Sequence, residues 1–359
     1  MPKNKLKYII VGDIHLSARN DSSLMMNHQI SFFEDTLFPY LKKHKIKHVL
    51  TCGDLFDRRK FTSHIVLAQW KQRVFDVMKD MGIDFTVVIG NHDCPWSNSL
   101  EANSPSLMLR EYDNITVIDT PTEVMLGNIK AAMIPWMCKD NWVQCSNLMD
   151  TTDAKYCFGH FDIQGFEMHR GVVSTEGHLP EKFNKFEQVI SGHFHSRSQK
   201  GNVLYVGTPY ALTWADAGEL RGFHVMSGDD GHIEFVPSHK EIFNKIVWDD
   251  KDKGTEYYKG FQLSGLENTY VKVIVINKTD PYQFDKFLTK LYSMTLADLK
   301  VMEDMSSLSA DEVDDEELEY EDTMTLVDSY VESVETDVDK TKIKTLMKAL
   351  YLEALSAEV

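Results

Sequence analysis

The chain has 359 residues, of which 43% are hydrophobic, so it is long enough for two or three domains with sizeable cores. Its formal net charge is −17, yet 16 Asp and Glu residues and no Lys or Arg lie between Glu303 and Asp339, and the remaining 39 acidic residues nearly balance the 38 basic ones. The acidity is therefore local and does not exclude a nucleic-acid substrate. The apolar runs are too short to span a bilayer and the N-terminus lacks the features of a signal peptide, so we expect a cytoplasmic protein without membrane contact.

The first ninety residues are predicted to alternate strands with helices. Three times, a strand-like run ends in a glycine followed by a polar residue: Leu6–Val11 before Gly12-Asp13, His48–Thr51 before Gly53-Asp54, and Phe85–Ile89 before Gly90-Asn91-His92. Helices are predicted between these runs, at about 26–44 and over Ser63–Met81 with Ser63 as N-cap. In α/β sheets the loops after the strands converge on one edge, so this repetition predicts one composite site.

From Ile115 to Phe235 the predicted strands are shorter and helices are fewer. The candidate strands are Val124–Ala132, Lys155–Phe158, Gln188–Ile190, Val203–Val206, Gly222–Met226 and His232–Val236, with a hairpin turn at Gly228-Asp229-Asp230-Gly231. The pattern predicts a second sheet packed on the first with helices outside both. The fold class expected for residues 1–240 is a four-layer α/β/β/α sandwich.

Three further segments follow this domain. Residues 241–300 are predicted to form a small α+β unit, with a strand over Val271–Ile276 and a helix over Pro281–Met294. Residues 301–322 are strongly acidic and poor in hydrophobic residues, which is typical of a solvated linker. Residues 323–359 carry apolar residues at helical spacing and are predicted to form two short amphipathic helices, at about 323–336 and 340–356.

Five short motifs carry the residues that could perform chemistry. In an extended segment residues i and i+2 point to the same side, so Asp13 can act with His15, and His193 with His195. The five motifs are Gly12-Asp13-Ile14-His15, Gly53-Asp54, Gly90-Asn91-His92-Asp93, Gly159-His160 and Gly192-His193-Phe194-His195.

The donor set in these motifs predicts a pair of divalent ions. Imidazole and carboxylate donors without a cysteine ligand suit Mn, Fe or Zn in an open site. Two ions about 3.5–4 Å apart need a shared ligand, and Asp54 is the natural bridge. Each motif alone is ordinary, since Gly-Asp usually makes a turn and Gly-His often ends a strand. Five of them in order, each after a strand-like run, favour the two-metal site over unrelated turns.

At these residues the sequence resembles the calcineurin-like metallophosphoesterases. Within that superfamily it is similar to the SbcD-type DNA repair nucleases, and especially to the recombination endonuclease small subunits of tailed phages. The resemblance covers roughly residues 6–240, and the remainder by arrangement. Three stretches point to the nuclease branch: Gly53-Asp54-Leu55-Phe56-Asp57 with Arg58-Arg59-Lys60, Tyr205-Val206-Gly207-Thr208-Pro209-Tyr210, and Arg221-Gly222-Phe223.

The resemblance implies roles for the motif residues. Asp13, His15 and His195 would hold one ion, Asn91, His160 and His193 would hold the other, and Asp54 would bridge them. The implied metal is Mn²⁺, with Mg²⁺ as the alternative. His92 would stabilise the transition state and assist the leaving oxygen. Asp57 stands where many members carry a second histidine, and it either orients His92 or pairs with Arg58 or Arg59.

The resemblance also implies a substrate and partners. The expected activity is hydrolysis of DNA phosphodiesters, as a 3′-to-5′ exonuclease on duplex ends and an endonuclease on single strands, in DNA recombination, repair and replication. The expected assembly is a homodimer bound to an SMC-like coiled-coil ATPase, docked through the C-terminal helices, with 241–300 as a capping and DNA-binding domain. No dense basic run is present, so DNA contact is expected from scattered residues: Arg58, Arg59, Lys60 and Arg197.

Two alternatives remain open at this point. The first is a metallophosphoesterase that acts on small nucleotides or phosphoproteins. The second is a non-catalytic scaffold that keeps the fold to bind a partner. A scaffold is expected to lose metal-ligating histidines, whereas every expected ligand is present in this sequence.

Overall fold

The computed structural model describes residues 6–96, 98–169, 172–238, 240–254, 257–303, 340 and 344. The chain divides into two compact units, Met1–Ser307 and Leu308–Val359. Everything that follows concerns the first unit. The predicted acidic linker and the two predicted C-terminal helices lie outside the described residues, apart from Glu303 and the two single positions.

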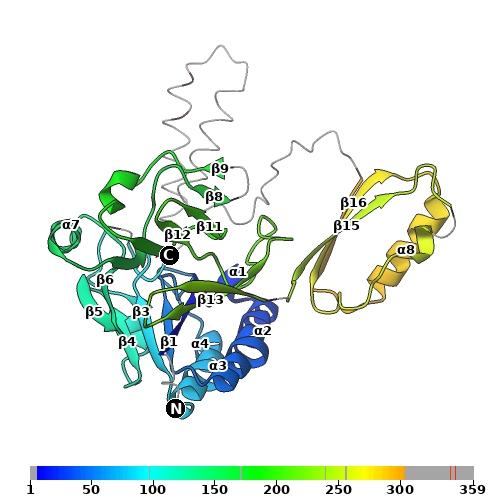
Figure 1. The fold of residues 1–359 in the computed structure, drawn as a ribbon. Coiled ribbons are helices and arrows are strands. Elements are labelled where there is room, and N and C mark those ends of the chain that lie inside the picture. Colours follow the sequence, from blue (N-terminus) through cyan, green and yellow to red (C-terminus); the bar gives the residue numbers. More distant parts are fainter. Residues whose placement is uncertain are drawn as a thin grey trace. The chain divides into compact units, whose positions relative to one another are not determined.

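The first sheet has six strands in the order β14-β13-β1-β2-β3-β4 (Figure 1). Strands β1 to β4 are parallel, whereas β13 pairs with β1 and β14 pairs with β13 in antiparallel fashion. The parallel arrangement brings the carboxyl ends of β1, β2 and β3 to one edge. The bounds are β1 Lys7–Val11, β2 His48–Thr51, β3 Asp84–Val88, β4 Ile115–Ile118, β13 Arg221–Ser227 and β14 Ile233–Ser238.

The second sheet repeats this plan, in the order β11-β12-β10-β7-β6-β5. Its four central strands are parallel, and each edge strand pairs in antiparallel fashion with its neighbour. The bounds are β5 Thr122–Leu126, β6 Ile129–Ile134, β7 Tyr156–His160, β10 Gln188–Gly192, β11 Ser198–Lys200 and β12 Val203–Tyr205.

Strand β1 shows how the layers form, because its side chains alternate between two cores. Tyr8 and Ile10 join a buried cluster with Phe158 and Ile190 of the second sheet, so this cluster lies between the sheets. The intervening side chains of β1 join a different cluster, which contains residues of the helices that follow β1 and β2. The prediction of an α/β fold with two sheets is confirmed, with the sheets face to face and helices on the outer side of the first.

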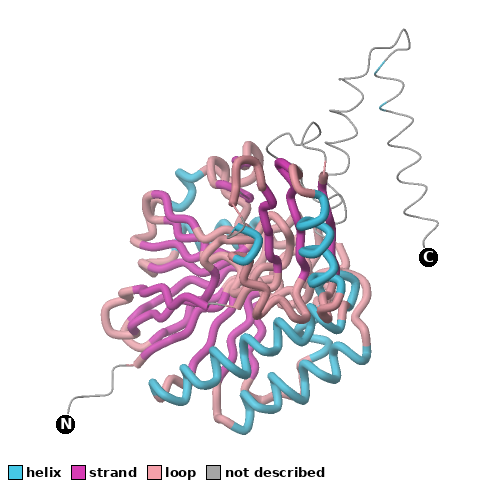
Figure 2. Tube along the Cα trace, turned by 90° about the vertical axis from the view of Figure 1, so that its right-hand side faces the viewer, coloured by secondary structure: helices cyan, strands magenta, loops and turns pink. Residues whose placement is uncertain are grey.

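Two long helical segments cover the first sheet, and Figure 2 shows them running along one side of the strands. The predicted helices are confirmed; each is interrupted by one turn of π-helix. Ser63 is the N-cap of the second segment and its Oγ accepts from the amide of Val66 at 3.4 Å, as predicted. The segments are α2 Ser23–Phe32, η1 Phe33–Leu37 and α3 Phe38–His44, then α4 His64–Trp70, η2 Lys71–Phe75 and α5 Asp76–Asp80.

Helix α7, Trp142–Thr151, covers the outer side of the second sheet. Its buried residues Cys145 and Met149 share a cluster with Ala132 of β6 and Val189 of β10. This helix supplies the fourth layer. The remaining elements of the two-sheet domain are short: α1 Ala18–Asp21, α6 Ser104–Met108, β8 Glu167–His169, β9 Val172–Val173 and η3 Pro180–Phe183.

A separate small core forms after residue 242. Three parallel strands in the order β15-β16-β17 pack with α8 around Trp248, which is fully buried. The predicted strand and helix are confirmed, with the helix two residues shorter than expected. The bounds are β15 Phe243–Asp249, η4 Tyr257–Lys259, β16 Tyr270–Asn277, α8 Pro281–Tyr292 and β17 Asp298–Met302.

One strand prediction was wrong. The apolar run Val124–Ala132 was expected to be a single strand, but the chain turns at Gly127, whose φ is +65°, and forms the antiparallel hairpin β5–β6. The polar pair Gly127-Asn128 in the middle of the run was the signal for this turn. Among the helices that the structure describes, none combines the length and apolar character needed to cross a membrane.

Buried His224 in β13 predicts that the metal-free protein loses stability in acid. Burial, assisted by the nearby cation of Arg197, lowers the pKa of His224 to about 4. The unfolded chain takes up a proton near pH 6.5 and the folded chain does not, so stability falls as the pH drops from 6.5 towards 4, by up to about 3 kcal/mol for this group. His224→Phe should flatten that pH dependence in urea titrations, whereas His44→Phe, on an exposed helix end, should leave it unchanged.

Candidate metal centre

The predicted ligands come together where parallel strands of both sheets end. Asp13 follows β1, Asp54 follows β2 and Asn91 follows β3, all in the first sheet. His160 is the last residue of β7 and His193 follows β10, its neighbour in the second sheet. The site therefore lies between the carboxyl ends of two face-to-face sheets, and this explains why its residues are spread over 180 positions.

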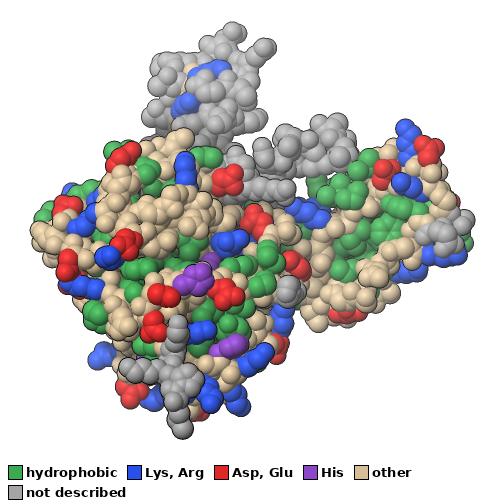
Figure 3. Space-filling view, in the orientation of Figure 1, with side chains coloured by type: hydrophobic (Ala, Val, Ile, Leu, Met, Phe, Trp, Pro, Cys, Tyr) green, Lys and Arg blue, Asp and Glu red, His purple; other side chains and the backbone are tan. Residues whose placement is uncertain are grey.

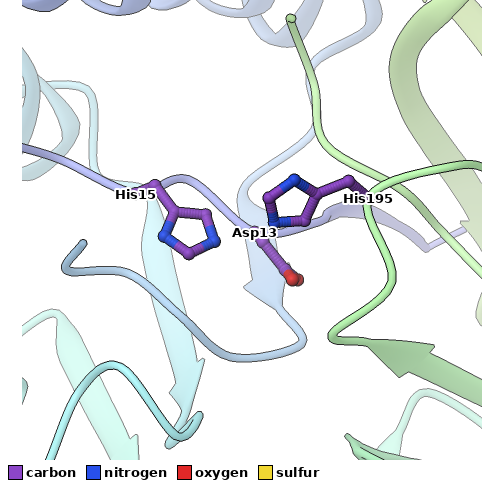
Figure 4. A group of neighbouring side chains, drawn as sticks. All are labelled: Asp13, His15 and His195. Carbon is purple, nitrogen blue, oxygen red and sulfur yellow. The ribbon is translucent and has the colours of Figure 1, made fainter. Parts of the chain in front are cut away.

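The first group contains Asp13, His15 and His195, whose potential ligand atoms all lie within 4.8 Å of one another. Figure 4 shows the two imidazole rings close together with the carboxylate of Asp13 beside them. The ring centroids of His15 and His195 are 5.1 Å apart, in an edge-on arrangement. Asp13 Oδ1 is buried without a hydrogen-bond partner among the described residues, as expected for a donor aimed at a cation.

The second group contains Asp54, His160 and His193, again with ligand atoms within 4.8 Å of one another. The Nδ1 atom of His160 lies 2.9 Å from the carbonyl oxygen of Cys52. That contact fixes the tautomer with the proton on Nδ1 and leaves Nε2 as the donor that faces the site.

Asn91 faces this second group, and its amide can be placed in two ways. With the oxygen inward, that oxygen lies 2.8 Å from His160 Nε2. With the nitrogen inward, it donates to His160 Nε2 at 2.8 Å and to His193 Nδ1 and Asp54 Oδ2 at 3.3 Å. The inward oxygen faces only other acceptors, a conflict that a bound cation resolves because all of these atoms are electron-pair donors.

Asp54 lies between the two groups. Its Oδ2 atom is 3.1 Å from His160 Nε2 and 3.8 Å from His15 Nε2. Its Oδ1 atom accepts from the backbone amide of His92 at 2.8 Å. The arrangement fits a carboxylate shared by two ions, and the clusters together are consistent with a dinuclear metal site.

The electrostatics of the metal-free site favour cation binding. Burial raises the pKa of Asp13 to about 6. Although burial opposes ionisation of Asp54 as well, His160 and His92 hold the pKa of Asp54 well below its usual range. Burial opposes protonation of His160 too, but the carboxylates of Asp54 and Asp13 raise its pKa to about 9. A proton on His160 thus offsets buried negative charge, and a divalent ion would replace it.

The predicted catalytic pair, His92 and Asp57, lies at the rim of the site. The Nδ1 atom of His92 is 2.7 Å from the backbone carbonyl oxygen of Asp57, so the main chain of Asp57 orients this ring. The carboxylate of Asp57 points elsewhere, with Oδ1 3.1 Å from Nδ1 of His15. Asp57 thus contacts both histidines, and its carboxylate completes a carboxylate–histidine pair of the kind that orients metal ligands.

Three predicted ligands have a left-handed backbone, which is strained for residues other than glycine. The φ angles are +49° for His15, +50° for Asp54 and +90° for His193. The surrounding structure holds these turns in place: the amides of Ile14 and His15 both donate to the carbonyl of Asp54 at 3.0 Å. The loops after β1 and β2 are therefore locked to each other.

Sequence reasoning missed several residues that support these loops. Buried Gln29 donates from Nε2 to the carbonyls of Ile14 and His15 at 3.0 and 2.9 Å, and Tyr210 donates to the carbonyl of Ile14 at 2.7 Å. Asp93 accepts from the amides of Phe56 and Gly90, both at 2.9 Å, and so ties the loop after β2 to the loop after β3. The position of Asp93 within the third motif was the available signal.

A buried ion pair supports the last histidine. Arg221 donates to the carbonyl oxygen of His195 and pairs with Asp216 at 2.8 Å. Burial opposes the charge of Asp216, but Arg221 holds its pKa below the usual range. The Arg221-Gly222-Phe223 stretch, noted in the sequence, therefore acts on the site through the backbone of His195.

The four predicted DNA-contacting cations lie in different surroundings. Arg58 pairs with Asp21 at 2.9 Å and lies 5.7 Å from the ring centroid of Phe61. Arg59 is half-buried beside Asn91, and Lys60 is exposed. The guanidinium of Arg197 lies over the ring of Phe235, on β14. Only Arg59 has a printed contact with a predicted ligand.

The glycine before Asn91 predicts a sharp test of the packing. A Cβ on Gly90 would lie 2.1 Å from Asp54 Oδ1 and 2.4 Å from the backbone nitrogen of Asp54. Gly90→Ala should therefore displace Asp54 and lower Mn²⁺ affinity by about ten- to a hundredfold, measured by calorimetric titration. Gly254→Ala is the control, since its Cβ would meet no atom within 4 Å. Equal affinity in both variants would contradict the placement of Asp54.

Comparison with known proteins gives a consistent result. The profile described as "Calcineurin-like phosphoesterase" matches residues 6–197. "Exonuclease subunit 1" of Enterobacteria phage T4 is 31% identical over 354 residues, 97% of this chain and 99% of that protein. "Putative phosphoesterase 244L" of Invertebrate iridescent virus 6 is 30% identical over 42% of this chain and 54% of its own length. "DNA double-strand break repair protein Mre11" of Sulfurisphaera tokodaii is 24% identical over 54% of this chain and 50% of its own length.

Proposed function

The chain belongs to the calcineurin-like phosphoesterase family, and we propose that it is the nuclease subunit of a DNA-processing complex. The proposed reaction is hydrolysis of DNA phosphodiesters in recombination and repair. The observation that carries it is the position of Asp54 Oδ2 between His160 and His15, which suits a two-ion site built for phosphoester hydrolysis. The similarity to a phage exonuclease subunit over 97% of this chain supports DNA as the substrate.

We assign the metal ligands as two sets joined by a bridge. Asp13, His15 and His195 hold one ion, and Asn91, His160 and His193 hold the other, with Asp54 shared. The mixed nitrogen and oxygen donors suit Mn²⁺, with Mg²⁺ as the alternative. When bound, the ions supply a water of lowered pKa and offset the charge of the phosphate.

The chain's own residues complete the reaction. The oxygen of the attacking water bonds to phosphorus, the bond from phosphorus to the leaving oxygen breaks, and a proton must reach that oxygen. His92, oriented by the carbonyl of Asp57, is the proposed donor of this proton. The carboxylate of Asp57 fixes the ring of His15 and so acts as a positioning group.

DNA binding is proposed to depend on separated cations. On the face shown in Figure 3, Lys and Arg side chains are interspersed with Asp and Glu and do not form one basic patch. Arg58, Arg59, Lys60 and Arg197 are the proposed contacts, with the small domain at 241–300 as a further DNA-binding and capping element. Because each contact with a phosphate releases a counterion, binding to a DNA end should weaken steeply with added salt.

The proposed assembly is a homodimer with an SMC-like coiled-coil ATPase, docked by the segment at 323–359. The similarity to a protein described as a subunit supports a partner chain. The finer activities proposed are 3′-to-5′ removal of nucleotides from duplex ends and endonuclease cleavage of single strands.

A nuclease assay tests the proposal. End-labelled duplex DNA is incubated with the chain and Mn²⁺ or Mg²⁺, with and without a co-purified ATPase subunit. Metal-dependent shortening of the labelled strand is expected, and excess EDTA should abolish it. Turnover of small phosphodiesters without any cleavage of DNA, even with the ATPase present, would instead favour an enzyme of small nucleotides or phosphoproteins.

A further inference from the structure

Arg59 stands apart from the other cations near the metal centre. It is half-buried, and its Nη2 atom lies 3.0 Å from the outward-facing atom of the Asn91 amide. Within the described part of the chain, no carboxylate lies at ion-pair distance from its guanidinium, whereas the adjacent Arg58 pairs with Asp21. A half-buried cation without an acidic partner is costly unless a ligand supplies the negative charge.

The Asn91 amide shows where that negative charge would lie. As a metal ligand, Asn91 turns its oxygen inward towards His160 and its nitrogen outward towards Arg59. The amide nitrogen and the guanidinium are both hydrogen-bond donors, and two donors 3.0 Å apart have nothing to accept their protons. An anionic oxygen placed beside both atoms would accept from each of them.

We propose that Arg59 is a catalytic residue whose guanidinium, together with the amide nitrogen of Asn91, donates to a non-bridging oxygen of the scissile phosphate. The inference rests on the phosphodiester hydrolysis proposed above and does not require DNA as the substrate. In the transition state the charge on these oxygens grows, and a preorganised donor there is worth about a hundred- to a thousandfold in rate. Arg59 thereby differs from Arg58, which is already paired and remains a contact to the DNA backbone.

The test uses the Mn²⁺-loaded full chain and two probes. Arg59→Ala should lower kcat for bis(p-nitrophenyl) phosphate by about a hundredfold and weaken binding of orthovanadate, measured by calorimetry, by a similar factor. Arg59→Lys should retain part of both, since it keeps the charge and loses the planar fork. The control is Arg73→Ala, at a surface arginine that hydrogen-bonds to Glu34 and Asn27 and should change neither value.

The outcomes separate this inference from a structural role and from the proposed function. Unchanged kcat and vanadate affinity in Arg59→Ala would overturn it. A loss of bound Mn²⁺ in both Arg59 variants would also overturn it, because Arg59 would then only hold the amide of Asn91. If the wild-type chain hydrolyses the small diester and never cuts DNA, the nuclease proposal fails while the loss in Arg59→Ala still supports a contact to phosphate.

Discussion

Asp54→Asn is expected to reduce phosphodiester hydrolysis by at least about a thousandfold. The substitution keeps the shape of the side chain and removes the negative charge that two cations would share. Asp54 is almost fully buried, and its Oδ2 atom lies between a histidine of each proposed ligand set. Without the carboxylate, the two sets hold their cations at close distance with less charge between them, so at least one ion should bind weakly or be lost.

Metal content and rate should be measured together for this variant. Elemental analysis after gel filtration in Mn²⁺ gives the number of ions per chain, and bis(p-nitrophenyl) phosphate gives the rate. Asp140→Asn, at an exposed position, is the control for the same chemical change. Two tightly bound ions together with normal turnover in Asp54→Asn would remove Asp54 from its bridging role.

His92→Ala is expected to have the second-largest effect, a loss of about a hundred- to ten-thousandfold in DNA cleavage. His92 is oriented by the carbonyl of Asp57 and is not assigned to either ligand set. Mn²⁺ content and affinity for a DNA end should therefore stay close to the wild-type values. The expected defect lies in protonation of the leaving oxygen.

A leaving group that needs no proton distinguishes this role from a structural one. Substrates with a p-nitrophenolate leaving group should lose much less activity in His92→Ala than DNA does, because that anion departs readily. Added imidazole should restore part of the DNA cleavage. If the variant cuts DNA at the wild-type rate, the assignment of His92 is wrong; equal losses on both substrates would indicate a different role in the site.

The local pattern predicted the fold and the convergence of the site well. Strand-like runs that end in glycine and a ligand-type residue specify both the element and the edge of the sheet where its loop emerges. The structure brings Asp13, Asp54, Asn91, His160 and His193 to that edge for this reason. The hairpin hidden in Val124–Ala132 was missed because apolar residues continue on both sides of its turn.

Contacts that depend on side-chain direction could not be predicted in the same way. Asp57 was a candidate for orienting His92, yet the contact uses its main chain while its carboxylate faces His15. Gln29 lies on α2, in a sequence with no distinctive motif, and only the packed structure brings its amide to the loop after β1. The donor pair formed by Arg59 and Asn91 likewise depends on distances across two loops.

The most direct test of the two-ion centre is anomalous scattering from crystals grown in Mn²⁺. Two peaks about 3.5–4 Å apart are expected. One should lie among Asp13, His15 and His195, and the other among Asn91, His160 and His193, with the carboxylate of Asp54 between them. A single peak, or peaks that do not contact these residues, would contradict the account.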